Sequence, residues 1–269
     1  MKERVLITVK TYPTISRSYS ELVCTAGLRE DGSWIRIYPV AFRQWKSQYK
    51  KFQWIEADLV KNKSDRRLES YKPISPDAIT LLDKIGTSNN WAERKQYVLE
   101  KGDVYHDLER LIQQNKEGKL SLATFKPAKI LDMVVEEVDR EWDKSKIEAL
   151  KAAAKQGDLF SDDAPEYFRI VDKLPYKFSY KLADEKGKES TMMIEDWEIG
   201  ALYWNCLKKH GDEAKAIADV RKKYIDDFAM TKDIYLFLGT TLKYDGWASN
   251  PFVITGTFTP DIELQQGLF

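Results

Sequence analysis

The residues best suited to chemistry in this sequence are acidic side chains that lie next to arginines. Asp65 and Glu69 flank Arg66 and Arg67, so a phosphate group could be held there beside an acid. Carboxylates that meet in the fold can bind Mg²⁺, which assists phosphodiester hydrolysis. We therefore take Asp65 and Glu69 as candidate catalytic residues of a metal-dependent nuclease or nucleotide-processing enzyme.

A second acidic cluster, Glu195, Asp196 and Glu198, lies where a predicted strand gives way to a helix. Asp196 and Glu198 are candidate catalytic residues by the same argument. The cofactor is open, and Mg²⁺ is expected only if the nuclease alternative holds. The structural alternative is the stronger one here, because the helix dipole favours acids at a helix N-terminus and Asp is a common N-cap.

Histidine and cysteine offer little for catalysis in this sequence. His106 and His210 stand outside any metal-ligand spacing, and neither accompanies a hydrolase signature such as Gly-x-Ser-x-Gly. The sequence also has no Walker lysine loop and no GxGxxG motif. Cys24 and Cys206 lie far apart, which disfavours a disulfide framework and indicates a reducing cytoplasm. Classical hydrolases, zinc enzymes, P-loop NTPases and Rossmann enzymes are therefore disfavoured.

A β-hairpin is predicted around Asp31 and Gly32, because an Asp-Gly turn here separates two β-rich runs. Side chains in the second run alternate between the two faces of the strand, which places Trp34, Arg36 and Tyr38 on one face. Two aromatic rings around an arginine can stack on bases and pair with phosphate. The same face is also compatible with the outer side of an ordinary sheet.

The N-terminal part of the chain is basic, although the whole chain has a net charge of zero. Residues 1–75 carry 15 Lys or Arg against 8 Asp or Glu, a net charge of +7, so the remainder carries −7. Such a region fits a polyanion, although lysines also protect sheet edges from aggregation. The candidate nucleic-acid contacts are Arg17, Trp34, Arg36, Tyr38, Arg43, Trp45, Lys46, Lys50, Lys51, Arg66 and Arg67.

The order of the predicted elements indicates an α+β protein. Residues 1–75 hold several short β-rich runs, which are typical of a basic curved-sheet or barrel-like module. From Pro76 the pattern turns helical, starting with a helix through Ile85, and 76–155 is predicted to mix helices and strands that pack on the first module. An acidic linker is predicted at 156–166, and a C-terminal α+β region at 167–269.

Two pentapeptides resemble the motif Gln-Leu-(Ser/Asp)-Leu-Phe, by which bacterial replication and repair proteins bind the β sliding clamp. They read Gln-Gly-Asp-Leu-Phe at 156–160 and Gln-Gln-Gly-Leu-Phe at 265–269, and they depart from the motif at Gly157 and Gly267. Alternatively, the Leu-Phe pairs fasten loose segments to the fold. The resemblance implies clamp contacts through Gln156, Leu159, Phe160, Gln265, Leu268 and Phe269.

Four short segments of the globular part are similar to a family of uncharacterised bacterial proteins. They are Thr8–Pro13, Cys24–Gly27, Trp34–Pro39 and Asp196–Glu198. This resemblance implies no activity, so it adds nothing to the functional hypotheses.

The leading hypothesis is a nucleic-acid-binding accessory protein of DNA replication, repair or phage defence that uses the basic aromatic face. DNA and RNA are both open as partners, and the β sliding clamp is a candidate protein partner. The first alternative is the carboxylate enzyme with Mg²⁺, and the second is a protein-interaction module without nucleic-acid contact. Because no apolar run is long enough to cross a bilayer, we expect a cytoplasmic protein without membrane contact.

Overall fold

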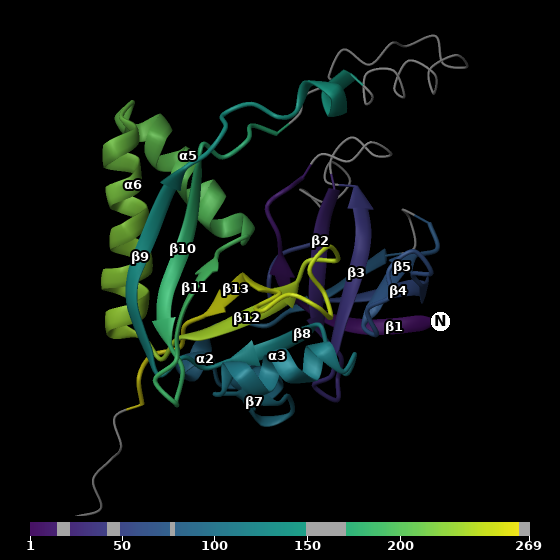
Figure 1. Cartoon of the computed structure of the whole chain (residues 1–269). Coiled ribbons are helices and arrows are strands. Elements are labelled where there is room, and N and C mark those ends of the chain that lie inside the picture. Colours follow the sequence, from purple (N-terminus) through teal and green to yellow (C-terminus); the bar gives the residue numbers. More distant parts are fainter. Residues whose placement is uncertain (15–21, 42–48, 76–78, 149–170, 264–269) are drawn as a thin grey trace, which may run out of the picture.

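The N-terminal region folds into a closed five-stranded barrel, as the computed structural model shows for the chain over residues 1–14, 22–41, 49–75, 79–148 and 171–263. Strand β1 (Lys2–Lys10) pairs with β2 (Leu22–Leu28) on one side and with β4 (Gln53–Lys61) on the other. β3 (Trp34–Ala41) pairs with β2 and with β5 (Ser70–Pro73), and β5 pairs with β4, which closes the ring (Figure 1). The predicted barrel-like module and the α+β class are confirmed.

One prediction near the barrel was wrong. The stretch from Pro76 through Ile85 was predicted to be a helix, but Ile79–Lys84 forms strand β6, which pairs antiparallel with β4. The free backbone hydrogen-bonding edge of β4 accounts for this, since tertiary pairing overrides local propensity in short segments. The sheet of the barrel therefore extends past residue 75.

The barrel strands are buried on both faces. Alternation along β1 sends Val5 and Ile7 into the barrel, where they pack with Ile35 and Ile37 of β3. The opposite face of β1 carries Leu6, which packs in a second cluster outside the barrel that is formed by residues from both halves of the chain. The barrel is thus joined to the rest of the molecule through an apolar layer.

The C-terminal half contributes two more sheets to the described fold. One has the order β13-β12-β8-β7, and the other, antiparallel throughout, has the order β11-β10-β9. An isolated bridge between Ile194 and Ile254 links them. Their strands are β7 (Val104–Tyr105), β8 (Leu122–Phe125), β9 (Lys129–Glu137), β10 (Tyr176–Ala183), β11 (Glu189–Met193), β12 (Tyr235–Thr240) and β13 (Phe252–Phe258).

The helices lie outside the sheets. Figure 1 shows α5 (Trp197–His210) and α6 (Glu213–Arg221) against the sheet of β9 and β10, and α6 continues into the π-helical segment η3 (Lys222–Ala229). Helix α2 (Ser88–Lys95) continues into a second π-helical segment, η1 (Gln96–Glu100), and α3 (Leu108–Lys116) precedes β8. None of the described helices is both long and apolar enough to span a membrane.

Candidate ligand cavity between the barrel and the C-terminal sheets

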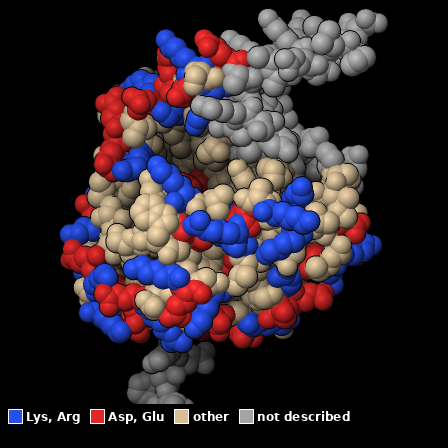
Figure 2. Space-filling view, turned by 45° about the vertical axis from the view of Figure 1, so that its right-hand side comes forward, with Lys and Arg blue, Asp and Glu red and all other residues tan. Residues whose placement is uncertain are grey.

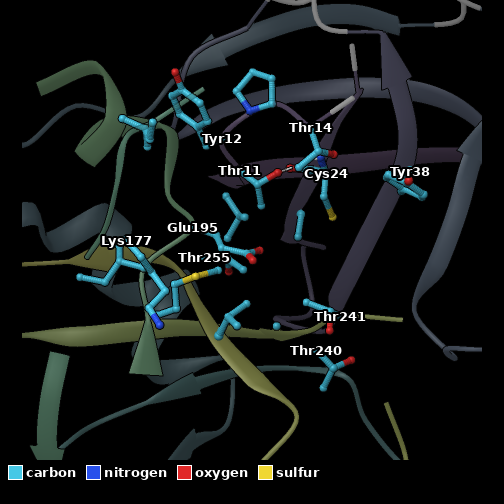
Figure 3. Close-up of a pocket in the computed structure, with 18 of the residues that line it drawn as sticks. Thr11, Tyr12, Thr14, Cys24, Tyr38, Lys177, Glu195, Thr240, Thr241 and Thr255 are labelled. Atoms are coloured by element: carbon cyan, nitrogen blue, oxygen red, sulfur yellow. Dashed lines mark hydrogen bonds between the residues drawn. The ribbon is translucent and has the colours of Figure 1, made fainter. Parts of the chain in front are cut away.

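A cavity of about 630 Å³ lies where β1, β2 and β3 of the barrel meet β10, β12, β13 and the end of β11. Its walls are mainly apolar, with several threonine hydroxyls and a few charged groups (Figure 3). The face shown in Figure 2 is hollowed near its top, with mainly uncharged side chains in the hollow and both basic and acidic side chains on the described part of its rim. A largely apolar cavity with a few convergent polar groups is typical of a ligand site.

Glu195 supplies the acidic group of this cavity. Its backbone is fixed on both sides, because its N–H donates to the Ile254 carbonyl at 2.7 Å and its carbonyl accepts from the Tyr12 N–H at 2.7 Å. The side chain points into the cavity beside Thr255 (Figure 3). Among the described residues, its carboxylate accepts no hydrogen bond and forms no ion pair. Burial raises the pKa of Glu195, and no partner opposes this shift.

The hydroxyls next to Glu195 are already engaged elsewhere. Thr255 Oγ1 donates to the Phe237 carbonyl at 3.1 Å. Thr11 Oγ1 accepts from the Cys24 N–H at 3.0 Å and donates to the Cys24 carbonyl at 3.3 Å. These bonds hold the ends of β1 and β2 and the middle of β13 in place. Among the described residues, no donor remains for the carboxylate of Glu195.

Cys24 projects its thiol into the cavity from β2 (Figure 3). Burial raises the pKa of this thiol, although the nearby guanidinium groups of Arg36 and Arg67 act in the opposite direction. The Glu195 carboxylate adds to the rise. Burial therefore outweighs the two guanidinium groups and favours the neutral thiol of Cys24.

Arg36 supplies the basic part of the wall and is 1% exposed. It donates through Nη1 to Ser121 Oγ at 2.7 Å and through Nη2 to the Ser121 carbonyl at 3.2 Å. Both Ser121 N–H and Ser121 Oγ donate to the Glu69 carboxylate, at 2.7 and 2.8 Å. In the described part of the chain Arg36 forms no direct ion pair, and burial lowers its pKa.

Asp65 and Glu69, the first predicted acid pair, both form hydrogen bonds within the protein. Asp65 accepts from Arg67 Nε at 2.8 Å, from Arg67 Nη2 at 2.6 Å and from Ser70 Oγ at 2.7 Å. Burial disfavours the charge of Asp65, but these hydrogen bonds outweigh it and lower its pKa to about 2. Because Glu69 is engaged by Ser121, the two acids serve separate structural contacts. No group of three or more His, Cys, Asp or Glu residues in the described ranges could hold a metal ion.

The second acid pair is also engaged within the chain. Lys51 Nζ lies 3.1 Å from Asp196 Oδ2 and 2.8 Å from Glu198 Oε2. Asp196 also caps α5, since its Oδ1 accepts from the Glu198 N–H at 3.2 Å, and it is fully buried. Burial raises the pKa of Asp196, whereas the two carboxylates outweigh burial at Lys51 and raise its pKa. The N-cap interpretation is confirmed, and the pair ties the barrel to α5.

The aromatic face predicted on β3 is only partly exposed, since Trp34 and Tyr38 are half-buried. Its alternation is as predicted, but Arg36 is buried, and Trp34 packs edge-on against Phe237 with ring centroids 5.4 Å apart. Tyr38 is half-buried at the cavity wall. The reason is that β8 and β12 cover this face of the strand, which strand periodicity alone could not indicate.

The other predicted nucleic-acid contacts are dispersed. Lys50 is exposed, Lys51 is ion-paired, Arg66 is exposed and donates to the Asp245 carbonyl, and Arg67 is buried with Asp65. Arg17, Arg43, Trp45 and Lys46 lie outside the described residues, as do the clamp-motif residues Gln156, Leu159, Phe160, Gln265, Leu268 and Phe269. The roles of all these residues stay predictions.

An exposed aromatic pair lies in the turn that follows Thr241, a residue of the cavity wall. Tyr244 is 42% exposed and Trp247 63% exposed, with ring centroids 5.7 Å apart. Trp247 also borders a second hollow of about 420 Å³, together with Arg66 and Lys116. Neither these two aromatics nor Cys24 was among the predicted site residues. The only available signal for the pair was a Tyr-Asp-Gly-Trp turn between two apolar strands.

These features define a class of α+β protein in which a cavity lies between a closed barrel and two C-terminal sheets and holds a carboxylate that no described residue pairs with. The chain belongs to the family described as Domain of unknown function (DUF8757), whose model matches residues 102–269. A second model, Domain of unknown function (DUF8758), matches residues 1–100. The two matches therefore meet close to the end of η1.

Comparison with known proteins adds only remote similarities. A solved structure described as a murine DNA binding protein bound with double-stranded DNA has 7% identity and a TM-score of 0.33, covering 98% of this chain and 97% of its own. The tetrameric p202 HIN2 structure has 7% identity and a TM-score of 0.30, covering 98% and 92%. These scores are too low to establish a shared fold. No curated protein matches the sequence.

Proposed function

We propose that the protein binds single-stranded nucleic acid and takes one unpaired nucleotide into the cavity. The observation that carries this proposal is the unpaired Glu195 carboxylate inside a space of about 630 Å³. Glu195 is half-buried, and a carboxylate that is partly removed from water without a partner loses solvation free energy. A ligand that donates hydrogen bonds to it would offset that cost.

The size and lining of the cavity support a nucleotide as the ligand. Its volume falls within the range of about 300–1,000 Å³ that is usual for small-ligand sites. Unpaired bases of single strands can leave the stack, enter a protein pocket and be read along their Watson–Crick edges. Apolar walls would contact the base face, and polar groups such as Glu195 and Arg36 would meet its edge.

The surroundings of the cavity support a polynucleotide rather than a free nucleotide. Tyr244 and Trp247 lie in the turn that begins at the cavity wall, and their exposed rings can stack on neighbouring bases. Arg66 and Lys116 lie beside Trp247 and can attract phosphates. The net charge of +7 over residues 1–75 acts in the same direction.

We further propose an accessory role in DNA replication, repair or phage defence. Only the sequence supports this more specific role. The two pentapeptides that resemble clamp-binding motifs are its basis. The nuclease alternative receives no support from the acids that were its candidates, because Lys51, Arg67 and Ser121 already engage them.

The test is fluorescence anisotropy with labelled single-stranded DNA, single-stranded RNA and duplex DNA across a salt series. We expect single strands to bind more tightly than duplex, with an affinity that falls steeply as salt rises. Trp247→Ala should weaken single-strand binding about tenfold, because a base–aromatic stack is lost. Leu131→Ala, on β9, is the matched control, because Leu131 is also an exposed apolar residue. Absence of binding at low salt, or a preference for duplex, would contradict the proposal.

A further inference from the structure

We infer that the cavity selects guanine, and that Glu195 is the residue that reads this base. The inference rests on the proposed function, because it specifies which nucleotide enters the same cavity. It starts from two facts about the wall: the carboxylate of Glu195 has no partner in the described part of the protein, and its neighbouring hydroxyls are used elsewhere.

The hydrogen-bonding pattern of guanine matches this carboxylate. An ionised carboxylate only accepts hydrogen bonds, and its two oxygens can accept two adjacent donors side by side. Guanine presents N1–H and N2–H₂ next to each other on its Watson–Crick edge. Adenine and cytosine each place a ring acceptor next to their amino group, and thymine and uracil flank their single N–H with two carbonyls. Guanine is therefore the one standard base that satisfies both oxygens of Glu195.

The presence of Arg36 in the cavity wall explains why a neutral base fits better than a cationic ligand. A guanidinium or ammonium group would also satisfy Glu195, but Arg36 lies in the same wall, fully buried and without an ion pair of its own among the described residues. The Cys24 thiol, which lines the same cavity, interacts electrostatically with both Arg36 and Glu195. A second cation here would be repelled, whereas the O6 carbonyl of guanine is an acceptor that suits the basic side.

The direction of the pKa shift at Glu195 also supports guanine as the ligand. Burial alone raises this pKa, so the empty cavity disfavours the ionised form. Two donors from guanine would stabilise the carboxylate again. Binding of guanine should therefore weaken as the pH falls and Glu195 takes up a proton.

The experiment measures the affinity of the full chain for a short oligothymidine strand with one central test base. The test bases are guanine, 7-deazaguanine, hypoxanthine, 1-methylguanine, adenine and thymine. Guanine and 7-deazaguanine share an unaltered Watson–Crick edge and should bind equally. Hypoxanthine lacks the 2-amino group and 1-methylguanine lacks N1–H, so each should bind about tenfold more weakly, the usual effect of losing one hydrogen bond to a charged group.

A variant pair tests whether Glu195 is the reader. Glu195→Gln keeps the shape of the side chain but presents an amide, and it should remove the preference for guanine over hypoxanthine. Glu189→Gln is the matched control, because Glu189 is an exposed residue of β11 whose carboxylate pairs with Lys181 at 2.7 Å. It should leave the preference unchanged. A thermal melt of both variants shows whether they are folded.

The outcomes separate this inference from the proposed function. Equal binding of all test bases, or an unaltered preference in Glu195→Gln, would overturn the guanine assignment while single-strand binding stands. Absence of binding by any strand would overturn both. If arginine amide protects the protein in a thermal melt and no strand binds, the ligand is a cation, and both the nucleotide and the guanine assignments fail.

Discussion

Asp65 and Glu195 are two desolvated carboxyl groups whose surroundings differ completely. Asp65 receives hydrogen bonds from Arg67 and Ser70, and these outweigh burial and lower its pKa to about 2. Glu195 receives none from the described residues, so burial raises its pKa. The difference indicates that Asp65 holds the fold together, whereas Glu195 is available for a ligand. Substitutions and pH changes at the two sites should therefore have opposite effects.

The largest expected effect is the loss of the Asp65 partner. Arg67→Met should destabilise the protein by about 4 kcal/mol, because it leaves Asp65 buried without a cation and removes the bond from Arg67 Nη1 to the Thr240 carbonyl. The measurement is the free energy of unfolding in urea. Arg66→Met, at the exposed neighbouring residue, is the control and should change stability by less than about 1 kcal/mol. Equal losses of stability in the two variants would show that buried Arg67 contributes no more to stability than exposed Arg66.

A second structural test concerns the ion pair between the barrel and α5. Lys51→Met should destabilise the protein by about 3 kcal/mol, since Asp196 is fully buried and would lose its cation. The effect should be smaller than that of Arg67→Met, because Asp196 can take up a proton and its pKa is already raised by burial. Lys50→Met alters an exposed neighbour and should leave the urea midpoint in place. A loss below 1 kcal/mol for Lys51→Met would mean that the barrel is held to α5 by apolar packing alone.

The pH dependence of stability should show the Asp65 network directly. Its folded-state pKa of about 2 lies below the ordinary value of 3.8, so the ionised form is the one that the fold stabilises. This stabilisation of about 2 kcal/mol is present above pH 4 and is lost as the pH falls towards 2. Urea unfolding of the native chain and of Asp65→Asn at several acidic pH values measures it. Parallel pH profiles for the two proteins would show that Asp65 does not contribute.

The smallest expected effect on stability has the opposite sign. Glu195→Gln should stabilise the unliganded protein at neutral pH by about 1 kcal/mol, because it removes a desolvated charge without a partner. The raised pKa means that the native chain loses stability as the pH rises above the ordinary value of 4.5. The gain from the substitution should therefore shrink below that pH. Thermal melts at pH 4 and pH 7 provide the measurement, and a destabilised variant would indicate that Glu195 is structural after all.

The sequence predicted the barrel because its strands carry regular alternation and a strong Asp-Gly turn signal around Gly32. It failed at Ile79–Lys84, where pairing with β4 decides the conformation. It also identified the alternation around Arg36 correctly but could not indicate that β8 and β12 cover that face. Local pattern therefore determined the elements, and long-range packing determined their exposure.

The cavity could not be found from the sequence for a related reason. Cys24 comes from β2 and Arg36 from β3. Both lie more than 150 residues before Glu195, which is at the junction of β11 with α5. The sequence presented Glu195 only as a member of an acidic cluster whose other members, Asp196 and Glu198, pair with Lys51. What sets Glu195 apart is that its carboxylate has no partner among the residues that the structure describes, and the spacing of residues in the sequence carries no signal for that.

The most direct test of the account compares the native chain with Glu195→Gln in the binding of one single strand that contains guanine, at constant salt and pH 7. We expect the variant to bind at least tenfold more weakly, because the donors of the base lose their carboxylate. Equal affinities for the native chain and the variant would contradict the claim that Glu195 is kept unpaired for a ligand.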